Sequence, residues 1–522
     1  MINIPDEFNI VSFLLDRHLK ERPDQVAIYY RDNRITYAKL GEIANRFGNA
    51  LLNLGVEREN RVIICLPDCP EFIAAYLGTI KIGAVPVPVS TMALSSDYLY
   101  YLNDSRAKAL LTNSELAAKI VEIKSRLQFL KHFIVLEKEL PGQLSFEKLI
   151  NDASDKLDIV STSKDDMAFW LYSSGTTGTP KGVVHLHHDL IHFMSPHCRE
   201  VVGISNQDIT IATSKLYFSY GRNSSLDSVL FAGSAVVLYP ERPDPEVIFR
   251  LVEKHRPTLF YSVPSSYLSM LDYIEKSGHK PDISSVRVCV SAGEVLPKVI
   301  FRRWKELFDI EIIDGVGSTD VGAIYISNRP GEQIKEGSCG KLLTGFEGKL
   351  LDEDNREVPQ GEIGELLIKN DGVTACYWNK HEKTKQSVCG EWFRTGDKYY
   401  QDKDGYYWYV GRADDMIKPG GLWLSPAEVE GILLEHEAVR DVAVVGIPLE
   451  ADIEKPVAFV VVKDKQTPSE KLEKELIEFV RNRTNHYKAP RNVYFKDELP
   501  RTASGKVQRY KLRNLLISNK EK

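Results

Sequence analysis

The feature that most constrains the fold is a repeated alternation between apolar, strand-like runs and helical patterns. RVIICLP is followed by EFIAAYLGTIKIGA at residues 71–84, and SAVVLYP is followed by PEVIFRLVEKH at residues 245–255. Strands that alternate with helices are typical of βα units, in which each helix crosses back to start a parallel strand. A chain of 522 residues is also too long for one ordinary core. We therefore expect an α/β fold with stacked, largely parallel sheets.

The middle and the end of the chain show two further patterns. Between about residues 340 and 410, short strand-like runs are broken by turns, which indicates a small antiparallel or barrel-like β region. After GRADDMIKPGG, a helical pattern at SPAEVEGILLEH is followed by strand patterns at DVAVVGIP and VAFVVVK. We expect a large domain over residues 1–412 and a small C-terminal α/β domain over residues 413–522.

Charge, cysteines and hydropathy exclude several classes of protein. The 67 basic and 73 acidic residues give a formal net charge of −6, which argues against broad contact with nucleic acid or an anionic membrane. The seven cysteines include no CxxC pair, which predicts neither a disulfide framework nor a zinc site. The N-terminus carries Asp6 and Glu7 instead of a basic start, and no apolar run reaches the ~18 residues that span a bilayer. We expect a cytoplasmic protein whose oligomeric state stays open, a homodimer included.

The segment SSGTTGTPKG at residues 173–182 is the strongest candidate for a ligand site. Its glycines let consecutive backbone N–H groups converge on phosphate oxygens, its hydroxyls add donors, and Lys181 adds a positive charge. A Walker loop requires Gly-Lys followed by Ser or Thr at the start of a helix, whereas here Pro180 precedes the lysine and Gly182 follows it. Because GVVHLH then alternates like a strand, we expect a polyphosphate loop between two strands. A flexible surface turn is the plain alternative.

Five further motifs follow this loop in a fixed order. They are SAGEVLP at 291–297, DGVGSTD at 314–320, WFRTGD at 392–397, GRADDMIKPGGLWLSPAEVE at 411–430 and LPRTASGKVQR at 499–509. In these motifs the chain resembles the adenylate-forming superfamily of acyl-CoA and aryl-CoA ligases, carrier-loading adenylation domains and luciferases. The likeness runs over nearly the whole chain. SKLYFSYGRNSSL and ERPDPEVIFRLVEKHRPTLFYSVPSSY look most like the benzoate-CoA ligase branch.

The resemblance implies an ATP- and Mg²⁺-dependent acid–thiol ligase. A small aromatic carboxylic acid, benzoate or a substituted benzoate, would attack the α-phosphate of ATP, and the thiol of CoA would then displace AMP. A stand-alone adenylation enzyme that loads the phosphopantetheine arm of a carrier protein would use the same residues, as would an oxidoreductase of the luciferase type. A non-catalytic nucleotide-binding protein is disfavoured because the charged motif residues Lys181, Asp397, Arg412 and Lys506 are all present.

The same resemblance assigns residues to ATP. Lys506, Lys181 and Thr319 would be catalytic, with Lys506 contacting the reacting carboxylate and the α-phosphate; a solvated lysine is the plain alternative for Lys506. The remaining nucleotide-binding positions fall on the phosphate loop, the adenine slot, the α-phosphate turn and the ribose contacts: Ser173, Ser174, Gly175, Thr176, Thr177, Gly178, Ser291, Ala292, Gly293, Glu294, Asp314, Gly315, Val316, Ser318, Asp397 and Arg412.

The acid pocket is expected on two segments, LYFSYGR at residues 216–222 and VGSTDVGAI at residues 316–324. Aromatic residues and glycines there favour a flat ring. An aromatic cluster is, however, more often plain core. The candidate substrate-binding residues are Tyr217, Phe218, Ser219, Tyr220, Gly221, Arg222, Gly317 and Ala323.

Three positions depart from the family pattern. Asp320 stands where the family usually has the glutamate that binds Mg²⁺; a hard cation accepts either carboxylate, so we expect a metal ligand here. Ala323 stands where we expect a histidine in the benzoate branch, which suggests a roomier pocket. Arg222 lies in a usually apolar stretch and would contact a polar substituent of the acid or form a surface salt bridge.

The C-terminal motifs imply movement of the small domain. Asp414 fits the family hinge, about which this domain alternates between an adenylating and a thiol-accepting arrangement. Gly420 and Gly421 would line the thiol tunnel, because a pantetheine arm close to backbone leaves no room for a side chain. A hairpin turn is the plain alternative for these glycines. The histidines of HLHHDLIHFMSPH lack a cysteine or acid cluster to complete a metal site, so we expect them in packing roles.

Overall fold

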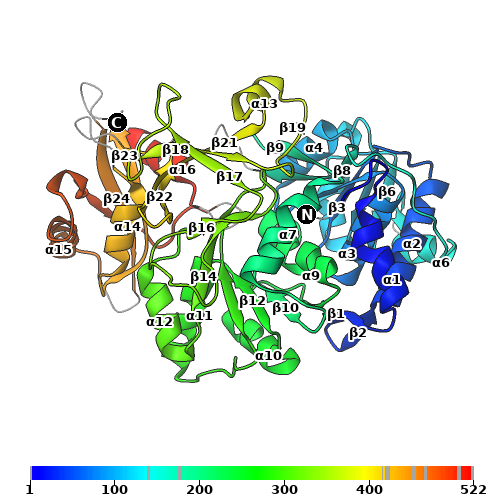
Figure 1. The fold of residues 1–522 in the computed structure, drawn as a ribbon, viewed down its shortest axis with the longest axis horizontal. Coiled ribbons are helices and arrows are strands. Elements are labelled where there is room, and N and C mark those ends of the chain that lie inside the picture. Colours follow the sequence, from blue (N-terminus) through cyan, green and yellow to red (C-terminus); the bar gives the residue numbers. More distant parts are fainter. Residues whose placement is uncertain are drawn as a thin grey trace.

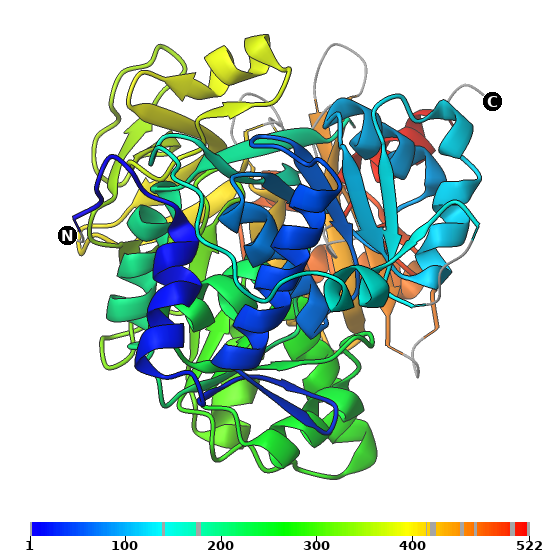
Figure 2. The ribbon, with the colours of Figure 1, turned by 90° about the vertical axis from the view of Figure 1, so that its right-hand side faces the viewer.

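The computed structural model of the protein describes residues 3–137, 141–173, 179–413, 415–417, 424–448, 454–463, 467–501 and 507–518. The elements that precede about residue 200 gather at one end of the molecule, and those from α14 (Pro426–Leu434) onward gather at the other (Figure 1). Figure 2 shows the N-terminal helices in front and the C-terminal elements, in orange and red, behind them. Among the described residues, no helix combines the length and the apolarity that crossing a bilayer requires.

A nine-stranded sheet carries the candidate residues of the expected adenine slot. Its order is β16-β15-β14-β13-β12-β10-β11-β1-β2, and all pairings from β14 across to β1 are parallel. Antiparallel pairs extend both ends. The bounds are β1 Val26–Tyr30, β2 Asn33–Thr36, β10 Ile209–Ala212, β11 Ala235–Leu238, β12 Leu259–Ser262, β13 Val288–Ser291, β14 Ile312–Gly317, β15 Ile324–Ser327 and β16 Lys341–Leu342.

A second sheet has five parallel strands in the order β4-β3-β5-β6-β7. One core contains residues of both sheets together with residues of α2 (Tyr37–Asn53) and α3 (Pro70–Lys81). Further helices cover the outer face of each sheet, with their own apolar cores. The remaining bounds of these layers are β3 Arg61–Cys65, β4 Val85–Pro88, β5 Ala109–Thr112, β6 His132–Val135, β7 Leu144–Ser145, α4 Ser95–Asp104, α5 Ser114–Val121, α10 Pro245–His255, α11 Pro264–Ser277 and α12 Lys298–Phe308. The stacked, largely parallel α/β architecture is confirmed.

Smaller antiparallel sheets complete the N-terminal part. One joins β8, β9 and β19, and another, between residues 347 and 412, is antiparallel throughout, as expected. The bounds are β8 Met167–Ser173, β9 Lys181–Leu186, β19 Cys376–Tyr377, β17 Glu347–Leu351, β18 Gly364–Lys369, β20 Val388–Cys389, β21 Trp392–Gln401 and β22 Tyr407–Arg412. The other helices here are α1 Arg17–Glu21, α6 Phe146–Asn151, α7 Asp189–Pro196, α8 Ser219–Arg222, α9 Ser228–Ala232 and α13 His381–Ser387.

The C-terminal part is a small α/β unit. Its sheet has the order β23-β24-β25, and α14 and α15 pack their apolar faces on it. The bounds are β23 Val439–Pro448, β24 Glu454–Val462, β25 Val493–Phe495, α15 Glu470–Arg481 and α16 Arg509–Ser518. The predicted small C-terminal domain is therefore present as an α/β unit, while its boundary at residues 412 and 413 stays a prediction.

Helices α2 and α3 approach each other closely at Gly78. A Cβ atom at this position would lie 2.4 Å from the carbonyl oxygen of Ala44, a backbone atom that cannot move aside alone. We predict that Gly78→Ala lowers the free energy of unfolding by about 1–3 kcal/mol, because the helices must separate. Gly431→Ala is the matched control, since this glycine lies within α14 and a Cβ there meets no atom within 4 Å. Thermal and urea unfolding of both variants measure the difference; equal stabilities would contradict the prediction.

Candidate functional site

The phosphate loop lies between β8 and β9. These strands pair antiparallel with Ser173 opposite Lys181, so the loop joins two strands, as expected, and does not open a helix. The Tyr100 hydroxyl donates a 2.7 Å hydrogen bond to the Pro180 carbonyl oxygen and so holds the chain just before β9. Five expected phosphate-binding residues lie outside the described residues: Ser174, Gly175, Thr176, Thr177 and Gly178.

Lys181 and Asp320 form an ion pair at the foot of this hairpin. Lys181 Nζ lies 3.0 Å from Asp320 Oδ1 and 3.9 Å from the centre of the Tyr377 ring. The Tyr377 hydroxyl donates a 2.6 Å hydrogen bond to the same carboxylate oxygen. Burial opposes ionisation of Asp320, but the charge of Lys181 and these hydrogen bonds outweigh it and lower the pKa of the carboxyl. The site therefore holds an ionised carboxylate beside a cation.

Asp320 belongs to a tight turn, residues 318–322, between β14 and β15. Gly322 N donates to Ser318 O at 3.0 Å, and His185 Nε2 lies 2.8 Å from the Thr319 carbonyl oxygen. His185 Nδ1 lies 3.0 Å from the Asp189 carboxylate, which fixes the imidazole. Gly322 has φ +94°, and a Cβ there would meet the Phe193 ring at 2.3 Å, so only glycine fits. The turn is thus held from β9 and from α7.

The expected adenine slot lies at the ends of β13 and β14. Ser291 and Asp314 pair across these strands, and Ala292, Gly293, Gly315 and Val316 lie beside them on the chain. The Asp314 carboxylate is buried, and its Oδ1 forms no hydrogen bond within the described part of the chain. Burial raises the pKa of Asp314 to about 8. The group is therefore mostly protonated at neutral pH and adds little negative charge beside a polyphosphate.

The expected ribose contacts also come together. Asp397 and Arg412 are direct partners in the β21–β22 pairing, and Arg412 Nη1 donates a 3.3 Å hydrogen bond to Asp397 Oδ1. Arg412 Nη1 also lies 3.4 Å from the Thr395 carbonyl oxygen, which orients the guanidinium.

One ion pair joins the C-terminal unit to the adenine slot. Arg501 Nη1 lies 3.7 Å from Glu294 Oε1, and Arg501 Nη2 lies 2.7 Å from Asp441 Oδ2. Arg501 and Val507 form an isolated antiparallel bridge at the base of the segment that contains Lys506. The start of this segment, at Arg501, therefore lies next to Glu294, a residue of the expected adenine slot. Lys506, Gly420, Gly421 and Asp414 themselves lie outside the described residues.

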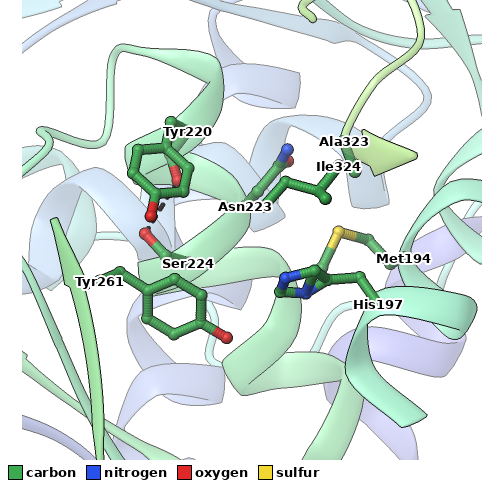
Figure 3. A pocket seen from close by; sticks show the side chains of 8 residues that line it. All are labelled: Met194, His197, Tyr220, Asn223, Ser224, Tyr261, Ala323 and Ile324. Atoms are coloured by element: carbon green, nitrogen blue, oxygen red, sulfur yellow. Dashed lines mark hydrogen bonds between the residues drawn. The ribbon is translucent and has the colours of Figure 1, made fainter. Parts of the chain in front are cut away.

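A small pocket of about 20 Å³ lies behind the turn (Figure 3). Its lining residues are Met194, His197, Tyr220, Asn223, Ser224, Tyr261, Ala323 and Ile324. Of the expected substrate-binding residues, Tyr220 and Ala323 line it. Tyr217, Phe218, Ser219, Gly221, Arg222 and Gly317 are not among its lining residues.

The structure places Arg222 in the interior of the protein. Its side chain is fully buried, Nε donates a 2.8 Å hydrogen bond to buried Asp227, and Nη2 donates to Asn223 Oδ1 at 3.0 Å. The surface salt bridge considered for Arg222 is therefore wrong, because burial requires a charged partner in the interior. Arg222 reaches the pocket only through Asn223, whose Nδ2 donates to Gly322 O at 2.6 Å.

A second buried pair anchors the segment before α8. Asp68 Oδ1 accepts a 2.9 Å hydrogen bond from Leu216 N, and Lys215 Nζ lies 3.8 Å from Asp68 Oδ2. Thr91 donates to the Tyr217 hydroxyl oxygen at 3.3 Å, on a side of the segment that does not line the pocket. These contacts set the path that carries Tyr220 into the pocket wall.

Comparison with known proteins agrees with this arrangement. The sequence profile described as AMP-binding enzyme matches residues 15–378, and that of the AMP-binding enzyme C-terminal domain matches residues 428–506. The chain belongs to the AMP-binding enzyme family. It is thereby an AMP-forming acid–CoA ligase, and the resemblance stated from its motifs is confirmed.

Three relatives illustrate the likeness. The benzoate–CoA ligase of Thauera aromatica is 40% identical over 516 residues, with 98% of this chain and 97% of the relative covered. A 4-hydroxybenzoate–CoA/benzoate–CoA ligase of Rhodopseudomonas palustris is 35% identical, with 99% and 95% covered. The crystal structure of the anthranilate CoA ligase AuaEII in complex with anthranoyl-AMP is 38% identical, with a TM-score of 0.95 and 99% of both chains covered.

Several residues at the candidate site of this AMP-binding enzyme were not predicted from the sequence. Tyr377, which contacts Asp320, lies in an ordinary strand pattern without a motif signal. His185 and His197 lie in the histidine-rich segment, where the packing role expected for His185 includes support of Thr319. Asn223 and Tyr261 reach the pocket from a helical turn and a strand end that only the folded chain brings together. Among the described residues, no group of three or more potential ligands forms a metal cluster.

The raised pKa of Asp314 makes a prediction about stability. Because its folded pKa of about 8 lies above the ordinary unfolded value, the native state retains a proton that the unfolded state loses, and stability falls as pH rises between the two values. We predict that Asp314→Asn gains stability relative to wild type as pH rises from about 4 to 8, by up to ~1.4 kcal/mol per pH unit, and no further above 8. Unfolding midpoints across this range test it, with exposed Asp155→Asn as the control. A difference that does not change with pH would contradict it.

Proposed function

We propose that this enzyme activates a small aromatic carboxylic acid, benzoate or a substituted benzoate, as its acyl-adenylate and transfers the acyl group to CoA. In the first step a carboxylate oxygen bonds to the α-phosphorus of ATP, and the bond to the bridging oxygen breaks to release pyrophosphate. In the second step the CoA sulfur bonds to the acyl carbon, AMP leaves with the carboxyl oxygen, and the thiol proton is lost. The names of the aryl-CoA ligase relatives support an aromatic acid.

The observation that carries this proposal is that one short turn joins the pocket to the charged site. Residues 318–322 carry Thr319 and Asp320 at one end, and the next residues, Ala323 and Ile324, line the pocket. A ring bound in this pocket would therefore contact a segment that lies only a few residues along the chain from Asp320. A flat acid in the pocket would direct its carboxylate toward the side where phosphates are held.

The residues of the charged site fit the demands of the first step. Two anions must approach each other, so the barrier is mainly electrostatic. We assign Lys181 and the loop from Ser173 to the β- and γ-phosphates, and Ser318 and Thr319 to the α-phosphate. Asp397 and Arg412 would hold the ribose hydroxyls.

Asp320 fits a magnesium ligand. Its carboxylate is ionised, and Mg²⁺ commonly takes one or two carboxylates and completes its shell with water and substrate phosphates. The ion would supply positive charge to the phosphates. The one-methylene difference from glutamate is compatible with this role, because water molecules can bridge the gap.

We predict that an aryl acid supports continuous pyrophosphate release only when free CoA is present. The enzyme is incubated with ATP, Mg²⁺ and a panel of benzoates, hydroxybenzoates, aminobenzoates and short fatty acids, each with and without CoA. Without a thiol the adenylate stays bound, so a single burst is expected; with CoA, turnover follows. A burst that CoA does not relieve would indicate a carrier protein as acceptor, and no release with any aryl acid would refute the aromatic substrate.

We also predict that Lys506→Ala slows adenylate formation by about 10²–10³-fold, because it removes a positive charge from the transition state. The second half-reaction is expected to be affected less when preformed benzoyl-adenylate and CoA are supplied. Lys511→Ala, on the surface of α16, is the matched control for loss of a nearby lysine. If Lys506→Ala left adenylate formation intact while abolishing thioester formation, the assigned role would be wrong.

A further inference from the structure

Two polar side chains face the pocket without partners. His197 Nε2 and Tyr261 Oη are buried, and neither forms a hydrogen bond within the described part of the chain. The Ser228 hydroxyl beside Tyr261 donates instead to the Ser224 carbonyl oxygen at 2.8 Å. Buried polar groups are nearly always hydrogen-bonded, so two such atoms at one pocket call for a ligand or water that pairs with them.

The other polar groups of the pocket are already engaged. The Tyr220 hydroxyl donates to Val290 O and Ser262 O, at 3.2 and 3.3 Å. The Ser224 hydroxyl donates to Tyr220 O at 2.8 Å, and both ends of the Asn223 amide have partners. Met194, Ala323 and Ile324 provide apolar wall. The unmet hydrogen-bonding capacity of the pocket is therefore concentrated on His197 and Tyr261.

The backbone beside the pocket departs from regular α-helical geometry at two places. His197 begins a π-helical turn, residues 197–201, that continues α7, and Asn223 begins another, residues 223–227, that continues α8. Such turns carry an extra residue, lose regular helical bonding and occur often at functional sites. In Figure 3 the imidazole of His197 points toward the side where Ser224 and Tyr261 lie. The ring centres of His197 and Tyr261 are 6.1 Å apart.

Both groups are neutral at physiological pH. Burial lowers the pKa of His197 to about 4, with only partial opposition from Glu200, and burial raises the pKa of the Tyr261 hydroxyl well above its usual value. A neutral imidazole carries one donor and one acceptor, and a phenol can do both. This pair suits a neutral group with an O–H or N–H, whereas a second carboxylate would meet no charged side chain among the described residues that line the pocket.

Resting on the proposed aryl-CoA ligase function, we infer that His197 and Tyr261 form a subsite for a hydrogen-bonding ring substituent. The acid activated best is then a hydroxy- or aminobenzoate, and benzoate itself is a poorer substrate. Sites built to hydrogen-bond a substrate hydroxyl or amine discriminate strongly against analogues that lack it, because their own polar groups stay unpaired.

The test compares kcat/KM for benzoate with that for the three hydroxybenzoates, the three aminobenzoates and the three methylbenzoates. A methyl group matches hydroxyl and amine in size but forms no hydrogen bond, so it separates polarity from shape. The variants are Tyr261→Phe and His197→Phe, each of which keeps an aromatic ring. Tyr267→Phe is the matched control, since its equally buried hydroxyl donates to Val290 O at 3.1 Å and does not line the pocket.

We expect wild type to prefer one hydroxy or amino isomer over benzoate, and over the methyl isomer at the same position, by ~10-fold or more. Tyr261→Phe and His197→Phe are expected to reduce this ratio, and Tyr267→Phe to preserve it. Equal use of benzoate or the methyl isomer, or a preference that survives both variants, would overturn the inference and leave the aryl-CoA ligase function standing. Failure of every aryl acid would instead refute the proposed function. If His197→Phe does not fold, the wild-type comparison together with Tyr261→Phe still tests the inference.

Discussion

The ion pair between Lys181 and Asp320 connects the two structural parts of the site. It joins β9, in a small antiparallel sheet, to the turn after β14, in the nine-stranded sheet, across 139 residues of sequence. Because both side chains are mostly shielded from water, the attraction is stronger than that of a surface pair, and the Tyr377 hydroxyl adds a third contact. This contact and the bond from His185 to Thr319 tie the strand after the expected phosphate loop to the turn that precedes the pocket.

Two buried carboxyl groups near the nucleotide side have opposite pKa shifts, and their surroundings explain both. Asp320 has a cation and a phenol within hydrogen-bonding distance, so it stays ionised despite burial. For Asp314, desolvation outweighs the hydrogen bonds that favour the charged form, so it retains its proton. Their surroundings thus keep the Asp320 carboxyl group charged and the Asp314 carboxyl group nearly neutral. A site that must hold a polyphosphate benefits from this division, because a second free negative charge would repel the substrate.

The helix and strand patterns of the sequence predicted the fold well, because each pattern depends only on residues that are neighbours in the chain. The helix expected at residues 245–255 is α10, and the position of Pro180 and Gly182 around the lysine indicated a loop between strands. The pocket was harder to predict. His197, Asn223 and Tyr261 come from three separate elements, and π-helical turns leave no periodic signal. Family motifs named the aromatic segment around Tyr220, but they did not show which of its side chains turn inward.

The ion pair also bears on how the site accepts a charged substrate. Before ATP binds, the negative charge of Asp320 is balanced by Lys181, so neither charge is buried alone. In the proposed mechanism Asp320 would hold Mg²⁺, whose positive charge would balance the carboxylate, and Lys181 would turn to the phosphates of ATP. Each charged group then exchanges one partner for another, which avoids the large cost of an unpaired buried charge at any stage. Because Lys181 and Asp320 keep 17% and 15% of their side-chain surface exposed, movement of the two side chains from β9 and from the turn would be enough for this exchange.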